Sequence, residues 1–188
     1  MSFLNTEICD FKLQAFHDGE FREINKEEIL KNHFSVIFFY PADFTFVCPT
    51  ELKDLSDNYK AFKERGVEIY SVSCDTHFVH KAWHDESPSI KNIQFPMIGD
   101  PTGILGKHFN VYNNENGLTD RGTFLLNKKG EVVLFEVSAG GIGRDASELL
   151  RKIDAALFVE KHGDQGCPAK WRKGQETLSQ TINDVGRY

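Results

Sequence analysis

The chain has 188 residues, of which 22 are Lys or Arg and 28 are Asp or Glu, so its formal net charge is −6. This length, with 40% hydrophobic residues, suits one domain with a full core and excludes a wholly disordered chain. The acidic balance argues against nucleic acid or an anionic membrane as the main partner. The most apolar run, residues 34–42, is far shorter than the roughly 20 residues of a membrane span. The first residues show no signal-peptide pattern, so we expect a cytoplasmic protein.

The first predicted elements are a hairpin, a short helix and a buried strand. Residues 11–24 favour a hairpin around the Asp-Gly pair at 18–19, which tolerates the positive φ of a tight turn. Asn25 and Glu28 resemble a capping box that opens a short helix. Residues 34–40 are almost continuously apolar, so this segment is predicted to be a central strand that is buried on both faces.

Further strands and helices alternate along the rest of the chain. Apolar residues at helical spacing predict a helix over residues 49–65. The other expected elements are strands at 67–74, 96–98, 122–127 and 131–136, and helices at 76–86, 102–109 and from 145 onward. This order predicts an α/β fold in which helices flank a mixed central β-sheet. The periodicity stops after Gly163, and the remaining residues are predicted to form a C-terminal tail.

The most informative segment joins the buried strand to the helix that follows it. Cys48 stands at the N-terminal edge of this helix, and Pro49 occupies the first turn, where proline is preferred. The free N–H groups and the dipole at a helix N-terminus stabilise an anion, which favours the thiolate, the reactive form of cysteine. The position alone leaves two interpretations open, a nucleophile or a small buried hydrophobic residue.

Motifs around this cysteine and along the chain resemble those of a known family. Pro41, Thr45 and Cys48 have the spacing Pro-x-x-x-Thr-x-x-Cys within FYPADFTFVCPTE at 39–51. This resembles the peroxidatic signature of the peroxiredoxins in their typical 2-Cys form. The resemblance covers essentially the whole chain and continues through SVSCDTHFVHKAW at 71–83, DPTG at 100–103, RGTF at 121–124 and GCPAKW at 166–171.

The resemblance implies a thioredoxin-like fold with an N-terminal β-hairpin, a peroxidase domain at 1–162 and a tail at 163–188. It implies reduction of hydrogen peroxide and organic hydroperoxides to water and alcohols. Cys48 would attack the O–O bond and become a sulfenic acid. The Thr45 hydroxyl would hydrogen-bond the peroxide and the thiolate, and Pro41 would shield the pocket from water.

The resemblance also assigns the remaining site residues and the partners. Arg121 would hold positive charge beside the thiolate, and Glu51 would orient that arginine. Cys167, in the tail, would come from the partner subunit and resolve the sulfenic acid as an intersubunit disulfide. The family uses no cofactor and forms homodimers, joined through edge strands, that assemble into a decamer. A flavoprotein disulfide reductase or a thioredoxin-type protein would supply the electrons.

Two other functions are weighed against a peroxidase. A thioredoxin-like binding or holdase module would need none of these residues together, and a thiol–disulfide oxidoreductase would need a CxxC motif, in which Glu51 replaces the second cysteine. Cys9 and Cys74 receive no role. His77, His80 and His84 lie at helical spacing but do not support a metal site. The glycine-rich run at 140–143, followed by Arg144, is interpreted as a turn from a strand to a helix.

Overall fold

The computed structural model describes residues 2–179, 181–182 and 185–186. The chain separates into two compact units, with the division between Ala146 and Ser147. The predicted division into a domain at 1–162 and a tail at 163–188 concerns function and independent folding, which compactness does not test, so it stays a prediction. Within the described residues, no helix is both long and apolar enough to cross a membrane.

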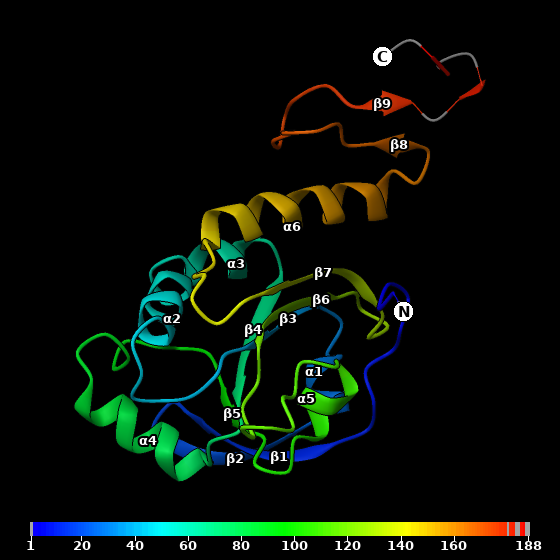
Figure 1. Ribbon diagram of the computed structural model, residues 1–188. Helices are drawn as coiled ribbons and strands as arrows, with labels where there is room; N and C mark the ends of the chain where they lie inside the picture. Colours follow the sequence, from blue (N-terminus) through cyan, green and yellow to red (C-terminus); the bar gives the residue numbers. More distant parts are fainter. Residues whose placement is uncertain (1, 180, 183–184, 187–188) are drawn as a thin grey trace. The chain divides into compact units, whose positions relative to one another are not determined.

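The first unit is built on a seven-stranded sheet with the strand order β2-β1-β5-β4-β3-β6-β7 (Figure 1). Strands β3, β4 and β5 run parallel to one another, whereas every other neighbouring pair is antiparallel. The mixed sheet predicted from the sequence is therefore confirmed. The strands are β1 (Lys12–His17), β2 (Glu20–Asn25), β3 (Phe34–Phe39), β4 (Val67–Ser73), β5 (Met97–Gly99), β6 (Arg121–Leu126) and β7 (Val132–Ser138).

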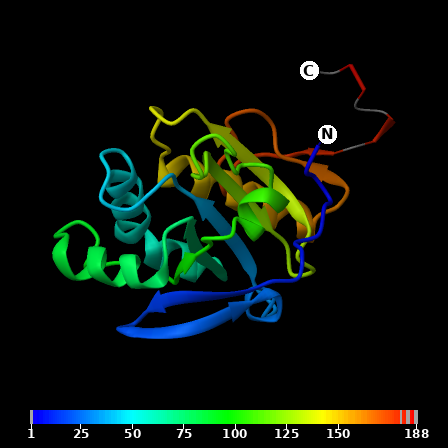
Figure 2. The same ribbon diagram turned by 60° about the horizontal axis from the view of Figure 1, so that its bottom comes forward.

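Helices cover both faces of this sheet. In Figures 1 and 2, α2 and α4 lie on one side of the sheet, and α1 and α5 lie on the other. The helices of this unit are α1 (Lys26–Ile29), α2 (Cys48–Asp57), α3 (Tyr59–Glu64), α4 (His77–Glu86) and α5 (Ile104–His108).

Strand β3 is buried at all six positions, as its continuous apolar run predicts. Its side chains alternate between the two faces of the sheet. Ile37 and Phe39 join the hydrophobic cluster that contains Ile29 of α1 and Leu105 of α5. Because the strand is central and enclosed, the end of β3 is a rigid point from which the next loop begins.

The N-terminal hairpin forms as its sequence predicts. Asp18 and Gly19 both have positive φ values, 50° and 81°, which match the two central residues of a tight hairpin turn. The side chain of Asn25 accepts a hydrogen bond from the backbone N–H of Glu28 at 2.9 Å, so the predicted N-cap of α1 is present.

The helix predicted over residues 49–65 is interrupted at Asn58. Its backbone N–H still donates to Asp54 O at 3.1 Å, but its side-chain amide donates to the same carbonyl at 2.9 Å. Asparagine side chains compete in this way for backbone groups, which weakens a helix. The segment is therefore two helices, α2 and α3, and the apolar stripe continues across the break.

The second unit contains α6 (Ala146–Lys161), whose first residue belongs to the first unit, followed by a short β-pair, β8 (Gln165–Gly166) and β9 (Leu178–Ser179). The sequence predicts the helix but not the pair, because two-residue strands leave no periodic pattern. Phe158 packs against Trp171, with 5.3 Å between the ring centroids, and so connects the helix to the segment beyond it.

Gly99 provides a test of how tightly β5 packs on the start of α4. A Cβ atom at Gly99 would lie 2.7 Å from Asp75 O and 2.8 Å from His77 N, both of them backbone atoms. Gly99→Ala should therefore lower the free energy of unfolding by about 1–3 kcal/mol, measured by urea denaturation of the reduced protein. The control is Gly141→Ala, where nothing lies within 4 Å of the added Cβ. Equal midpoints for the two variants would contradict this packing.

Candidate active site

Cys48 is the first residue of α2, and the loop at 40–47 leads to it from the end of β3. Val47 accepts hydrogen bonds from the backbone N–H groups of Thr50 at 3.0 Å and Glu51 at 3.3 Å, which close the first turn. Pro49 lies in this turn, as predicted. The Cys48 residue is only 1% exposed, so its thiol is held inside the protein at a helix N-terminus.

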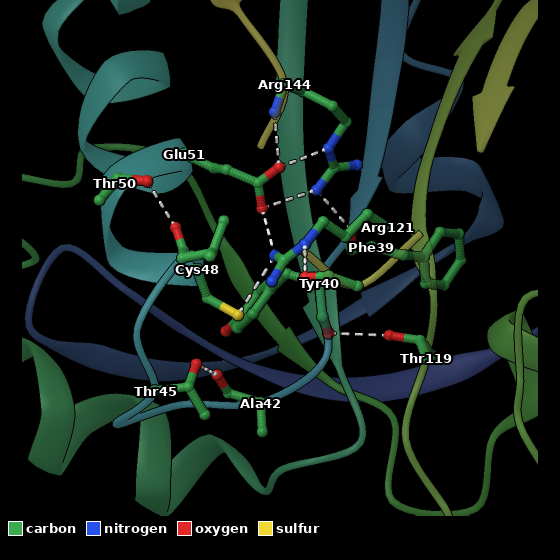
Figure 3. A network of polar contacts seen from close by, with 12 residues as sticks. Phe39, Tyr40, Ala42, Thr45, Cys48, Thr50, Glu51, Thr119, Arg121 and Arg144 are labelled. Atoms are coloured by element: carbon green, nitrogen blue, oxygen red, sulfur yellow. Dashed lines mark hydrogen bonds and ion pairs between the residues drawn. The ribbon is translucent and has the colours of Figure 1, made fainter. Parts of the chain in front are cut away.

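Arg121 reaches the thiol from the neighbouring strand. Because β6 is antiparallel to β3, with Phe38 opposite Thr123, Arg121 begins its strand at the edge where β3 ends. Its Nη1 donates to Cys48 Sγ at 3.4 Å and to Glu51 Oε2 at 2.6 Å (Figure 3). Its Nε donates to Gly140 O at 2.8 Å. These contacts fix the guanidinium against the sulfur.

Glu51 joins Arg121 to a second arginine. The backbone N–H of Arg144 donates to Glu51 Oε1 at 2.9 Å, and its Nε donates to the same oxygen at 2.8 Å. Nη2 of Arg144 lies 3.2 Å from Oε2, the oxygen that also accepts from Arg121. The carboxylate is buried and bridges two guanidinium groups, as the dashed lines in Figure 3 show.

Arg144 is the residue of this network that the sequence analysis did not identify. It donates to Phe39 O, Gly122 O and Thr123 Oγ1 at 2.9, 2.9 and 3.0 Å, and its Cζ lies 3.4 Å from the ring centroid of Phe38. The feature that could have indicated the position of Arg144 is the hairpin of β6 and β7. Since β7 returns antiparallel to β6, residues after it come back beside the start of β6.

Charge and burial act against each other at these arginines. Burial lowers the pKa of Arg144, opposed by the hydrogen bond and charge of Glu51. Burial also opposes the positive charge of Arg121, but the hydrogen bond to Cys48 and the charge of Glu51 outweigh it and raise the pKa of Arg121. Two guanidinium groups and one carboxylate leave a net positive charge, so an anionic sulfur at Cys48 makes the cluster neutral.

A cavity of about 340 Å³ adjoins the thiol and Arg121. Thr45 lines it, and its hydroxyl donates to Ala42 O at 2.8 Å. Phe46, which is 93% exposed, stands at the cavity. The complete lining consists of Pro41, Thr45, Phe46, Val47, Cys48, Asn113, Asn116, Leu118, Thr119, Asp120, Arg121 and Gly140. A small molecule can therefore approach the sulfur from this side.

Five of the six predicted site residues come together in the first unit, namely Pro41, Thr45, Cys48, Glu51 and Arg121. The sixth, Cys167, belongs to the second unit, where its Sγ lies 3.9 Å from Ala155 O. All four cysteines are free thiols. Burial raises the pKa of Cys9 and of Cys167, and it raises the pKa of Cys74 to about 11.

Comparisons with known proteins identify the family to which this fold belongs. The model of the AhpC/TSA family matches residues 4–135. Alkyl hydroperoxide reductase C of Salmonella typhimurium is 52% identical over 187 residues, with 100% of both chains covered. The crystal structure of Enterococcus faecalis AhpC is 45% identical, with a TM-score of 0.87 over 89% of this chain and 100% of that one. The reduced 2-Cys peroxiredoxin of Plasmodium vivax is 33% identical, with a TM-score of 0.92 over 97% and 96%.

The chain therefore belongs to the AhpC/TSA family and is a 2-Cys peroxiredoxin of the AhpC type. The family indicated by the sequence motifs is confirmed, and so is the thioredoxin-like fold that it implied.

The bridging carboxylate yields a stability prediction. Glu51→Gln keeps the shape of the side chain but leaves Arg121 and Arg144 without their buried counter-charge. We expect the free energy of unfolding to fall by about 3–5 kcal/mol, because breaking a buried ion pair on one side leaves an uncompensated charge. The measurement is the urea midpoint of the reduced protein.

The matched control lies on the same helix. Asp57 pairs with Lys53 at the surface, where both side chains are more than half exposed. Asp57→Asn should leave the midpoint nearly unchanged, because exposed ion pairs contribute little. If the midpoint fell equally in both variants, the buried ion pairs of Glu51 would contribute no more stability than a surface ion pair.

Proposed function

We propose that this protein is a thiol peroxidase in which Cys48 is the nucleophile. The Cys48 thiolate attacks one oxygen of a hydroperoxide, the S–O bond forms and the O–O bond breaks. The alkoxide or hydroxide that leaves takes up a proton and departs as an alcohol or water, and Cys48 becomes a sulfenic acid. The observation that carries the proposal is the single Nη1 group of Arg121, which donates to both Cys48 Sγ and Glu51.

The other residues of the cavity have roles in this proposal. The Thr45 hydroxyl gives its hydrogen to Ala42 O, so its oxygen is left to accept a hydrogen bond from the peroxide O–H. Arg121 stabilises the negative charge that develops on the leaving oxygen. Glu51 orients Arg121, and Pro41 forms part of the wall that keeps water from the sulfenic acid.

Cys167 of the partner subunit completes the cycle. Its thiol attacks the Cys48 sulfenic acid, and an S–S bond forms as one water molecule leaves. Cys48 is 1% exposed, so the first turn of α2 must unwind before two thiols on separate surfaces can bond. An external dithiol, supplied by a flavoprotein disulfide reductase or a thioredoxin-type protein, then restores both thiols. This cycle suits the reducing cytoplasm.

The proposed assembly is a homodimer that associates further into a decamer. Strand β7 is an edge of the sheet, which fits pairing with a second copy. Phe44 and Phe46, in the loop before Cys48, are 58% and 93% exposed. Two large exposed aromatic residues in one loop fit a contact between dimers. Unwinding at Cys48 then loosens this contact, so redox state and assembly are linked.

The first functional prediction concerns the nucleophile. Cys48→Ser should abolish peroxide turnover, because a hydroxyl does not ionise in the range where a thiol does. The assay is peroxide-dependent oxidation of NAD(P)H, coupled through each reductant system in turn. Cys74→Ser is the control, since the pKa of Cys74 is raised to about 11 and it should remain active. Turnover above a few per cent in Cys48→Ser would assign the nucleophile to another thiol.

The second concerns the resolving step. Cys167→Ser should reduce one equivalent of peroxide and then stop with Cys48 as a sulfenic acid. Oxidised wild type should migrate as a disulfide-linked dimer on a non-reducing gel, and the variant as a monomer. If oxidised wild type contained only an intrachain disulfide, the assignment of Cys167 to the partner subunit would be wrong.

A further inference from the structure

A second polar cluster joins the loop at 40–47 to α4, outside the cavity. Tyr40 Oη donates to Asp43 Oδ1 at 2.7 Å, and His80 Nδ1 lies 2.7 Å from Asp43 Oδ2. The side chains of Asp43 and His80 are both 0% exposed. None of the three residues lines the cavity. Burial, together with the charge of Asp43, raises the pKa of Tyr40, so its hydroxyl stays protonated and donates a hydrogen bond to Asp43.

His80 lowers the stability of the fold at this position through one of its ring nitrogens. Among the described residues, its Nε2 is buried without a hydrogen-bond partner, and a buried unpaired polar atom destabilises a fold. An apolar side chain would fill the same space without this cost. The polar contacts that compensate are made by Nδ1, which lies 2.7 Å from Asp43 Oδ2 and 3.4 Å from Tyr40 Oη, both in the loop that leads to Cys48.

The same loop is attached at further points to α4 and to the segment just before it. The backbone N–H of Asp43 donates to Asp75 Oδ2 at 2.9 Å. Trp83 of α4 packs against Tyr40 and Phe44, with ring centroids 6.1 and 5.9 Å apart. Phe44 has a φ of 54°, a conformation that a bulky residue adopts only when its surroundings impose it. The loop is therefore held in a strained, closed form by contacts to α4 and to Asp75, which lies just before this helix.

We propose that Tyr40, Asp43 and His80 form a positioning latch, which holds the loop at 40–47 closed and so slows the unwinding of the first turn of α2. This inference rests on the proposed function, because it concerns the fate of the Cys48 sulfenic acid. In the closed form that group meets a second hydroperoxide, which oxidises it to a sulfinic acid and leaves as an alcohol or water. In the open form it forms the disulfide with the partner's thiol. The latch sets the ratio of these two products.

The test measures this ratio in variants that loosen the latch by steps. Tyr40→Phe removes the buried hydrogen bond to Asp43 and the longer contact with His80, so disulfide formation should become about fivefold faster and the sulfinic fraction about fivefold smaller at the same peroxide excess. His80→Leu should shift the ratio further in the same direction. His80→Asn should restore it towards wild type, because the asparagine amide nitrogen takes the place of Nδ1 and still donates to Asp43.

Two measurements follow the products and the opening. Intact mass spectrometry counts the disulfide and the two-oxygen adduct of Cys48. Stopped-flow fluorescence follows Trp83, which contacts the loop, with Trp171→Phe present in every protein so that one tryptophan remains. The control is His84→Leu, one turn further along α4, where the ring packs against Phe16 instead of the loop. It should keep the wild-type ratio.

The latch would be excluded if Tyr40→Phe gave the wild-type rate and ratio, whether or not His80→Leu folds. It would equally be excluded if His84→Leu shifted the ratio as much as His80→Leu, because the effect would then be general destabilisation of α4. If wild type formed no disulfide at all, the proposed function would fail first, and the latch with it. If wild type formed the disulfide but Tyr40→Phe and His80→Leu kept the wild-type product ratio, the latch would be excluded and the proposed function would stand.

Discussion

The carboxylate of Glu51 connects three segments of the chain that are distant in sequence. It belongs to α2, while Arg121 begins β6 and Arg144 follows β7, and all three side chains are largely buried. A buried carboxylate is stable only when counter-charges and hydrogen-bond donors surround it. Together with the buried Leu52 and Leu55, this ionic bridge fixes the position of α2, and with it the position of the Cys48 thiol. The same bridge that holds helix and sheet together places a cation on the sulfur.

Local patterns were sufficient to predict several elements of the fold, including the strand and helix that flank Cys48. The Asp-Gly pair at 18–19 requires a tight turn, and the apolar run of β3 requires burial on both faces, whatever the rest of the chain does. The position of Cys48 at a helix N-terminus followed from the order of strand, loop and Pro49. The break at Asn58 could not be predicted from periodicity, because a side-chain hydrogen bond to Asp54 ends α2 while the apolar stripe continues.

Contacts between residues that are distant in the sequence could not be predicted from local patterns. Arg121 and Cys48 are 73 positions apart, and Arg144 is 93 positions from Glu51. No periodic pattern relates such residues, so the role of Arg121 came from the family resemblance, and Arg144 was taken as part of a turn. The contact between His80 and Asp43 could not be predicted for the same reason. The helical spacing of three histidines does not indicate that one of them contacts the loop after β3. Only the order of strands in the sheet brings these residues together.

That separation along the chain has a consequence for the order in which the site is made during synthesis. The ribosome produces Cys48 first, and the two guanidinium groups of its cluster emerge 73 and 96 residues later. Until β6 pairs with β3 and the segment after β7 returns, the thiol of the nascent chain is an ordinary, solvated cysteine. Its cationic surroundings appear only with the completed sheet. An unfinished chain therefore carries a thiol that is not yet activated, and only the finished enzyme places Cys48 beside a cation at the wall of a cavity.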